Sequence, residues 1–276
     1  MIQNNIAKKP QASFASYVKS DAVLANITKT LGSATRGKKF VASIISAVNT
    51  DKKLMECDFP TIISAGIVGD SLNLSPSPQL GHYYMVPFRD TKNNRTVATF
   101  QLGYKGYLQL AIRSGQYKKI NVVAVKDGEL LSYNPFTEDI EVRAITDPLE
   151  REKAPTIGYY GMFELTNGFT KSMYWSKETM EEHAQKYSKG YAAHKGYTFW
   201  EKDFDGMAFK TILRQLISKW GIMSIEMQTA IETDMSFKDD VSSEPVYFDS
   251  EENQQVEQVQ VYQEQTYQEP EGVSLV

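Results

Sequence analysis

Residues 101–115 read Gln-Leu-Gly-Tyr-Lys-Gly-Tyr-Leu-Gln-Leu-Ala-Ile-Arg-Ser-Gly, and this stretch turns from an extended segment into a helix through two glycines. After the turn, aromatic, cationic and apolar residues recur at helical spacing. The turn can offer backbone amides to a phosphate group, and Lys105 and Arg113 can offer positive charge. Tyr104 and Tyr107 are available to stack on bases. The stretch therefore predicts a strand, a glycine corner and a short basic helix.

The segments around this stretch predict further strands. His82–Phe88 and Val97–Leu102 are β-rich and flank a polar turn that carries Arg89, Lys92 and Arg95, which indicates a hairpin with a basic tip. Another hairpin is expected where Asn-Gly separates two β-rich runs. The strands expected after the central helix are Lys119–Val125, Leu130–Tyr133, Glu138–Ala144, Thr156–Leu165 and Phe169–Trp175.

Helices are expected at both ends of the chain. Apolar positions three and four apart, N-cap residues and breaker residues give their limits. The expected helices are a frayed Phe14–Leu24, then Lys38–Val48, Pro60–Leu72, Ser176–Tyr187, Phe199–Trp220 and Ser224–Thr233. The order is helices, an antiparallel strand meander with hairpins around an inserted helix, and then helices, which is typical of the α+β class.

Charge divides the chain into a basic body and an acidic end. Residues 234–276 hold eleven acidic residues and one basic residue, Lys238, for a net charge of −10. The whole chain carries −4, so residues 1–233 carry +6. This arrangement is seen in proteins that bind polyanions, although a solvated body with a solubilising tail gives the same distribution. We expect a flexible segment at 1–30, one folded domain at 31–233 and an acidic, disordered tail at 234–276.

Composition favours a soluble protein of a reducing cytoplasm. No apolar run approaches the roughly 20 residues that a membrane span requires, and the first residues lack the apolar stretch of a secretory signal. The single cysteine, Cys57, cannot form a disulfide within the chain.

The sequence offers no convincing active site. Gly32-Ser-Ala-Thr-Arg-Gly37-Lys38-Lys39 lacks the Ser or Thr that a phosphate-binding P-loop places after its lysine. The three histidines show no metal-ligand spacing. Glu201, Asp203 and Asp205 are the densest acidic group of the body, and a nuclease would need such a cluster to hold divalent ions. Their favourable interaction with the dipole at a helix start is the preferred explanation. We expect no cofactor and no catalytic residue.

What remains is a surface of basic and aromatic residues, for which a core role of the aromatics is the alternative. Single-stranded nucleic acid is bound by stacking and by phosphate neutralisation, and each stacked base contributes about 1–3 kcal/mol. Tyrosine and tryptophan stand beside cations at several places along the chain. These places are Tyr104/Lys105, Tyr117/Lys118/Lys119, Tyr187/Lys189 and Trp200/Lys202.

Ordered motifs between about Lys39 and Thr233 make the chain resemble the RecT family of phage single-strand annealing proteins. The motifs are Leu72-Asn-Leu74-Ser-Pro76, Gly81-His-Tyr-Tyr-Met-Val-Pro87-Phe88, Gln101-Leu-Gly-Tyr-Lys-Gly-Tyr107, Leu110-Ala-Ile-Arg113-Ser-Gly115, Trp200-Glu-Lys-Asp-Phe-Asp-Gly-Met207-Ala-Phe-Lys210-Thr and Arg214-Gln-Leu-Ile-Ser-Lys-Trp220. Two positions depart from the family pattern. Asn73 stands where glycine is frequent, and Lys105 replaces the arginine of some members, which keeps the charge but loses the bidentate fork.

The resemblance implies a protein that anneals complementary DNA strands without ATP and assembles into rings or helical filaments in a bacterial host. It implies single-stranded DNA and its complement as ligands, and a phage exonuclease and the host single-strand binding protein as possible partners. The first-ranked DNA contacts are Gln101, Tyr104, Lys105, Tyr107 and Arg113. The second-ranked contacts are Lys118, Lys119, Lys202, Lys210 and Arg214, and the third-ranked are Arg89, Lys92 and Arg95.

Four questions stay open at this point. The protein could bind and protect single-stranded DNA without annealing it, or cleave DNA with the carboxylates near Asp203. Arg113 could instead pair with a carboxylate within the fold. The acidic tail is a spacer, a docking segment for a partner protein, or an electrostatic mimic of DNA that limits non-specific binding.

Overall fold

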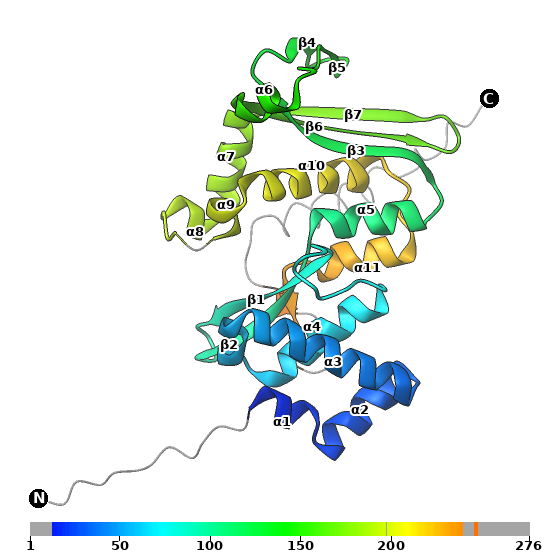
Figure 1. The fold of residues 1–276 in the computed structure, drawn as a ribbon, viewed down its shortest axis with the longest axis vertical. Coiled ribbons are helices and arrows are strands. Elements are labelled where there is room, and N and C mark those ends of the chain that lie inside the picture. The colour runs from blue at the N-terminus through cyan, green and yellow to red at the C-terminus, as the bar shows by residue number, and fades with distance from the viewer. Residues whose placement is uncertain (1–12, 197, 240–245, 248–276) are drawn as a thin grey trace, which may run out of the picture.

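The computed structural model describes residues 13–196, 198–239 and 246–247, and it confirms the α+β class (Figure 1). One half of the molecule holds the N-terminal helices and a sheet built on β1 and β2. The other half holds the sheet of β3, β6 and β7 with the helices that follow it. Helices α5 and α11 lie between the two halves.

The N-terminal half begins with a small helical bundle. Its elements are α1 (Phe14–Val18), α2 (Asp21–Leu31), α3 (Ala34–Thr50), the 3₁₀ helix η1 (Lys52–Glu56) and α4 (Phe59–Ser71). The side chains of Phe14, Val18 and Ile27 are buried, so residues 13–30 are packed helices where the sequence suggested a flexible segment. Residues 1–12 lie outside the described part. Gly32 ends α2 in the left-handed region and Ser33 caps α3, so the P-loop-like stretch is a junction between helices.

The first sheet has the strand order β1-β2-β8-β9. Its strands are β1 (Tyr83–Asp90), β2 (Arg95–Leu102), β8 (Ser236–Phe237) and β9 (Val246–Tyr247). The hairpin of β1 and β2 is antiparallel and in register from Tyr83↔Leu102 to Asp90↔Arg95. The fold therefore continues past Thr233, because β8 adds to β2 and the side chains of Asp234, Ser236 and Phe237 are buried. The remainder of the expected tail, 240–245 and 248–276, lies outside the described residues, apart from β9.

The second sheet has the antiparallel order β3-β6-β7. Its strands are β3 (Tyr117–Lys126), β6 (Thr156–Leu165) and β7 (Thr170–Ser176), and the smaller hairpin of β4 (Leu130–Asn134) and β5 (Asp139–Val142) and helix α6 (Pro148–Lys153) connect β3 to β6. Tyr159 and Phe163 of β6 are fully buried on the face that α10 covers. A methyl group on Gly161 would lie 2.4 Å from Ile212 of α10, so this glycine permits the close approach of the helix.

The C-terminal helices differ from the expected pattern at two points. They are α7 (Lys177–Tyr187), α8 (Lys189–Ala192), α9 (Phe199–Lys202), α10 (Phe204–Trp220) and α11 (Ile225–Thr233). The single helix expected over Phe199–Trp220 is broken at Asp203, whose side chain caps α10 by accepting from the Gly206 amide at 3.0 Å. The loop expected after α7 contains the short helix α8. No helix in the described part of the chain is long and apolar enough to cross a bilayer.

Helix α5 (Tyr104–Arg113) is held tightly against the start of β1. The Gly103 amide donates to the His82 carbonyl at 2.9 Å. A methyl group added at Gly103 would lie 2.3 Å from the Gly81 carbonyl oxygen. One added at Gly106 would lie 2.2 Å from the His82 carbonyl oxygen. Both glycines of the corner are therefore needed for the contact between two backbone segments.

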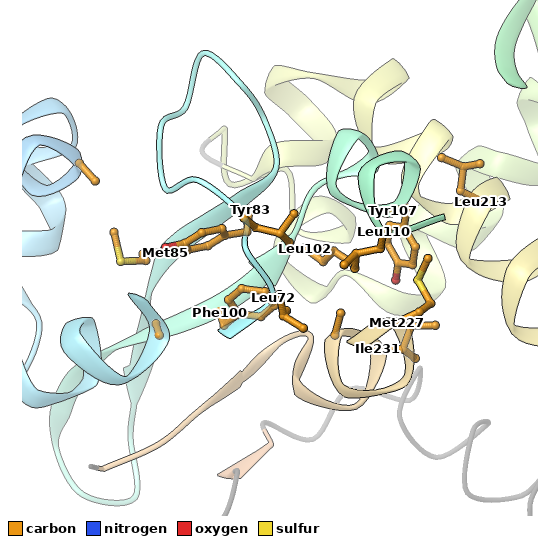
Figure 2. Close-up of a cluster of buried hydrophobic side chains, with 14 of the residues drawn as sticks. Leu72, Tyr83, Met85, Phe100, Leu102, Tyr107, Leu110, Leu213, Met227 and Ile231 are labelled. Atoms are coloured by element: carbon orange, nitrogen blue, oxygen red, sulfur yellow. The ribbon is translucent and has the colours of Figure 1, made fainter. Parts of the chain in front are cut away.

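The buried face of α5 joins the two halves of the core. Tyr107 and Leu110 point towards Met227 and Ile231 of α11, while Leu102 continues the cluster towards Tyr83 and Phe100 (Figure 2). Tyr107 is fully buried. The prediction that Tyr107 stacks on a base therefore conflicts with its place in the core, where a base cannot reach its ring.

Replacing Gly106 with alanine is expected to destabilise the fold by about 1–3 kcal/mol, because the added methyl group meets a backbone oxygen that cannot turn away. The measurement is the free energy of unfolding in urea. Gln109→Ala, on the exposed side of the same helix, is the matched control and should change stability by no more than about 0.5 kcal/mol. Equal stability of the two variants would contradict the close-packing role of the glycine.

Candidate nucleic-acid interface

Basic and aromatic side chains meet where the start of α5 faces β1 and α9. The Lys105 ammonium lies 5.9 Å from the centre of the Tyr104 ring, and the Tyr84 and Phe199 rings lie 5.6 Å apart. A methyl group on Gly81 would contact both the Tyr84 hydroxyl and the Lys105 side chain, so these two groups lie beside each other. We call Tyr84, Tyr104, Lys105, Phe199 and Lys202 the Tyr84–Lys105 surface.

Three of its members are solvent-exposed and two are half-buried. Lys105, Phe199 and Lys202 are exposed, while Tyr84 and Tyr104 are partly covered. Phe199 and Lys202 are three positions apart on α9, which places them on the same side of that helix. The Tyr104 ring is supported from behind by Phe209 of α10 in an edge-to-face contact at 5.4 Å. The surface therefore offers ammonium groups and ring faces side by side, the combination that single-stranded nucleic acid requires.

The uncharged groups of this region stay uncharged near neutral pH. Burial lowers the pKa of His82, and the positive charges of Arg113 and Lys105 lower it further. The neutral imidazole is consistent with its Nδ1 accepting a hydrogen bond from the Ser75 amide at 3.3 Å. Burial raises the pKa of the Tyr84 hydroxyl, and so do Asp203 and Tyr104. The positive charge of the surface therefore comes from its two lysines.

Arg113 lies at the other end of α5 and holds a helix end. Its guanidinium donates to the carbonyl oxygens of Leu72 at 2.7 Å and of Asn73 at 3.1 Å, just past the end of α4. A cation at this place satisfies carbonyl groups that the helix leaves unpaired. Arg113 therefore has a structural role in this conformation, through carbonyl groups rather than the carboxylate considered from sequence.

Lys210 and Arg214 are occupied by an internal carboxylate. Asp234 is fully buried and accepts from Lys210 Nζ at 2.9 Å, from Arg214 at 2.9 Å and from the Leu102 amide at 2.9 Å. Lys210, ranked from sequence as a second-line DNA contact, is only 7% exposed. Their side chains join α10 to β2 and do not face a ligand in this conformation.

The remaining predicted contacts lie on strands or in the turn between them. Gln101 stands directly opposite Tyr84 in the ladder of β1 and β2, so it borders the Tyr84–Lys105 surface. Gln101 is half-buried on β2 and donates to Thr99. On β3, Lys118 pairs with Glu164 at 2.5 Å, and Lys119 is exposed.

The tip of the β1–β2 hairpin has its own network. Arg95 pairs with Asp58, Asp90 and Asp239, and Arg89 donates to Asn94. Lys92 is exposed at the same turn. Of the thirteen sequence-predicted residues, Tyr104 and Lys105 lie together, Gln101 stands opposite Tyr84, and Lys202 lies on α9 with Phe199. The structure adds Tyr84 and Phe199 to the predicted set. The Gly81-His-Tyr-Tyr motif contained a signal for Tyr84, whereas Phe199 had none because its contact to β1 is long-range.

The acidic group near the start of α10 serves the helices. Glu201 forms a capping box with Thr198, Asp203 caps α10, and Asp205 accepts from the Tyr159 hydroxyl at 2.6 Å. The described residues contain no group of three or more His, Cys, Asp or Glu side chains that could hold a metal ion. The helix-start explanation of these carboxylates is confirmed.

Comparison with known proteins agrees with this arrangement. Residues 38–259 match the RecT family. The chain belongs to the RecT family. It is 40% identical over 238 residues to the "Uncharacterized protein YqaK" of Bacillus subtilis (strain 168), covering 83% of this chain and 78% of that protein. It is 31% identical over 183 residues to "Protein RecT" of Escherichia coli (strain K12), covering 66% of this chain and 65% of that protein.

Membership of the RecT family supports a recombination-related single-strand annealing role. The matched range begins within α3 and includes the whole Tyr84–Lys105 surface and the Asp234 contact. Helices α1 and α2 lie before it.

Asp234→Asn is expected to destabilise the protein by about 3–5 kcal/mol, because it leaves Lys210 and Arg214 buried without a counter-charge. Chemical denaturation measures the loss. Asp239→Asn, which removes the exposed carboxylate that pairs with Arg95, is the control and should cost less than about 1 kcal/mol. A loss at Asp234 no larger than at Asp239 would show that the buried contact is unimportant.

Proposed function

We propose that the protein binds single-stranded DNA without ATP and anneals it to a complementary strand during phage homologous recombination. The observation that carries this proposal is the Tyr84–Lys105 surface, which combines exposed lysines with supported aromatic rings in a chain of the RecT family. Lys105 and Lys202 neutralise phosphates, and the rings of Tyr84, Tyr104 and Phe199 receive bases.

Annealing by this route needs no covalent chemistry. Base pairing supplies the driving force, and the protein reduces the repulsion between two phosphate backbones. Bases that stack on aromatic rings are kept from stacking on one another. This contact accepts any base, so it does not depend on the DNA sequence. The neutral His82 and the buried tyrosines of the core keep the surface in place without adding charge.

The wider setting is also proposed from the family resemblance. The protein works in the cytoplasm of a bacterial host, self-assembles into a ring or helical filament, and cooperates with a phage exonuclease and the host single-strand binding protein. The alternative is a protein that binds and protects single-stranded DNA without annealing it.

Complementary fluorescent oligonucleotides mixed with the full chain at moderate salt are expected to pair faster than they do alone, without ATP or magnesium. Energy transfer between the two labels measures the rate. Non-complementary oligonucleotides are the control. Tight binding of one strand with an unchanged pairing rate would select the protective alternative, and an absence of binding would overturn both.

Lys105→Ala and Lys202→Ala are each expected to weaken DNA binding and to reduce the slope of log affinity against log salt by roughly 0.7 per lost phosphate contact. Fluorescence anisotropy over a salt series measures the slope. Lys177→Ala, which removes an exposed lysine of α7, is the matched control and should leave the slope unchanged. Identical slopes in all three variants would reject the Tyr84–Lys105 surface as the phosphate contact.

A further inference from the structure

A shallow apolar groove runs along the N-terminal helices, away from the Tyr84–Lys105 surface. Its floor is formed by Leu24 of α2 and by Val41, Ala42 and Ile45 of α3, and Lys19 and Lys38 stand at its sides. Ile45 also lines an adjoining hollow, and we call the two hollows together the track. The other residues of that hollow are Ser13, Phe14, Ala15, Val48, Asn49, Met55 and Phe59. The track presents apolar side chains with ammonium groups along its edge.

The helices that carry the track are basic. Residues 13–56 contain seven Lys and Arg residues and three Asp and Glu residues. Lys19 and Lys38 are exposed, and so are Lys39, Lys52 and Lys53. A partner that fits this track has apolar side chains interspersed with carboxylates.

The sequence contains such a segment at residues 248–276. It holds seven Asp and Glu residues and no Lys or Arg, and Val256, Val259, Val261 and Tyr262 stand among its carboxylates. The other candidate from the same chain, residues 1–12, carries Lys8 and Lys9 and no acidic residue. Its charge has the same sign as the edge of the track, so charge complementarity selects residues 248–276.

The segment can reach the track within one molecule. Tyr247, in β9, belongs to the sheet that α4 covers, and α4 packs against α3, which carries the track. Twenty-nine residues follow Tyr247 in the sequence. At about 3.3 Å per extended residue they span roughly 95 Å, far more than the two packed layers between β9 and α3.

We propose that residues 248–276 dock in the track on α2 and α3 of their own chain. Valine and tyrosine side chains fill the apolar floor, and the carboxylates pair with Lys19 and Lys38. Docking holds a polyanionic segment on the N-terminal helices, where it does not compete with DNA for Lys105 and Lys202. The contact is defined without DNA, so it stands or falls independently of the proposed function.

Zero-length cross-linking of the full chain with a carbodiimide tests this contact. The reagent activates a carboxylate as an O-acylisourea, and a lysine amine within contact distance attacks its acyl carbon, which forms an amide and releases the reagent as a urea. Mass spectrometry is expected to find Lys19 and Lys38 joined to glutamates of 248–276, and these products should be lost at 1 M salt, where the Debye length falls to about 3 Å. Yields no higher than those at the exposed Lys177 of α7 would overturn the proposal.

An equal mixture of ¹⁴N- and ¹⁵N-labelled protein separates contacts within one chain from contacts between copies. The proposal expects both peptides of each product to carry the same label. Mixed-label products in the statistical proportion would overturn docking within one chain and would point to a neighbouring copy.

Substitutions in the floor of the track supply the structural control. Ala42→Glu changes an exposed residue and leaves both lysines in place, so the fold is retained, and circular dichroism checks this. The cross-links at Lys19 and Lys38 should be lost, because the new carboxylate repels the segment and spoils the apolar floor. Ile45→Glu provides a second test at a half-buried position. Unchanged cross-links in a folded Ala42→Glu variant would overturn the proposal.

Discussion

The buried carboxylate of Asp234 connects three parts of the chain that are far apart in sequence. It accepts hydrogen bonds from the backbone of β2, at Leu102, and from Lys210 and Arg214 of α10. These groups belong to the two halves of the molecule, so one charge network fixes the position of the second sheet and its helices relative to the first. Removing one partner of a buried ion-pair network leaves a buried charge uncompensated, so the three side chains must keep their relative positions. The amide of Met235, next in sequence, donates to the Phe100 carbonyl, and β8 then adds to the edge of β2.

The position of α5 depends on this junction and on the glycine corner. Leu102 donates to Asp234, and Gly103 donates to the His82 carbonyl, so both neighbours of the helix start are fixed by hydrogen bonds. The corner first suggested a cradle for phosphate, but its glycines serve contact between backbone segments. The same contact sets Lys105 beside Tyr84. The corner therefore acts on a ligand through the side chains that it positions, and the glycines themselves need not touch it.

Local patterns in the sequence predicted the elements well, and long-range contacts limited the prediction of the site. Period and capping residues located strands β1 to β7 and most of the longer helices, because these signals are carried by neighbouring residues. The short elements η1, α6, α8, β8 and β9 were not predicted. Lys210 and Arg214 were predicted as DNA contacts because nothing in their helix reveals Asp234, some twenty residues away. Tyr107 was predicted to stack on a base because the sequence does not show whether an aromatic residue beside a cation lies in the core or at the surface. Phe199 was missed for the converse reason, as its ring meets Tyr84 across the two halves.

The cations of this chain consequently fall into two physical groups. Arg113, Lys210 and Arg214 meet carbonyl oxygens or a buried carboxylate, and their guanidinium or ammonium groups hold helices in place. Lys105 is exposed beside the Tyr104 ring, and Lys202 is exposed on α9, three positions from Phe199. Charge alone cannot separate these groups, because both consist of basic residues in the same motifs. Burial separates them: a cation that already satisfies the fold has little to offer a phosphate, whereas an exposed lysine beside a supported ring can neutralise a backbone while its neighbour receives a base.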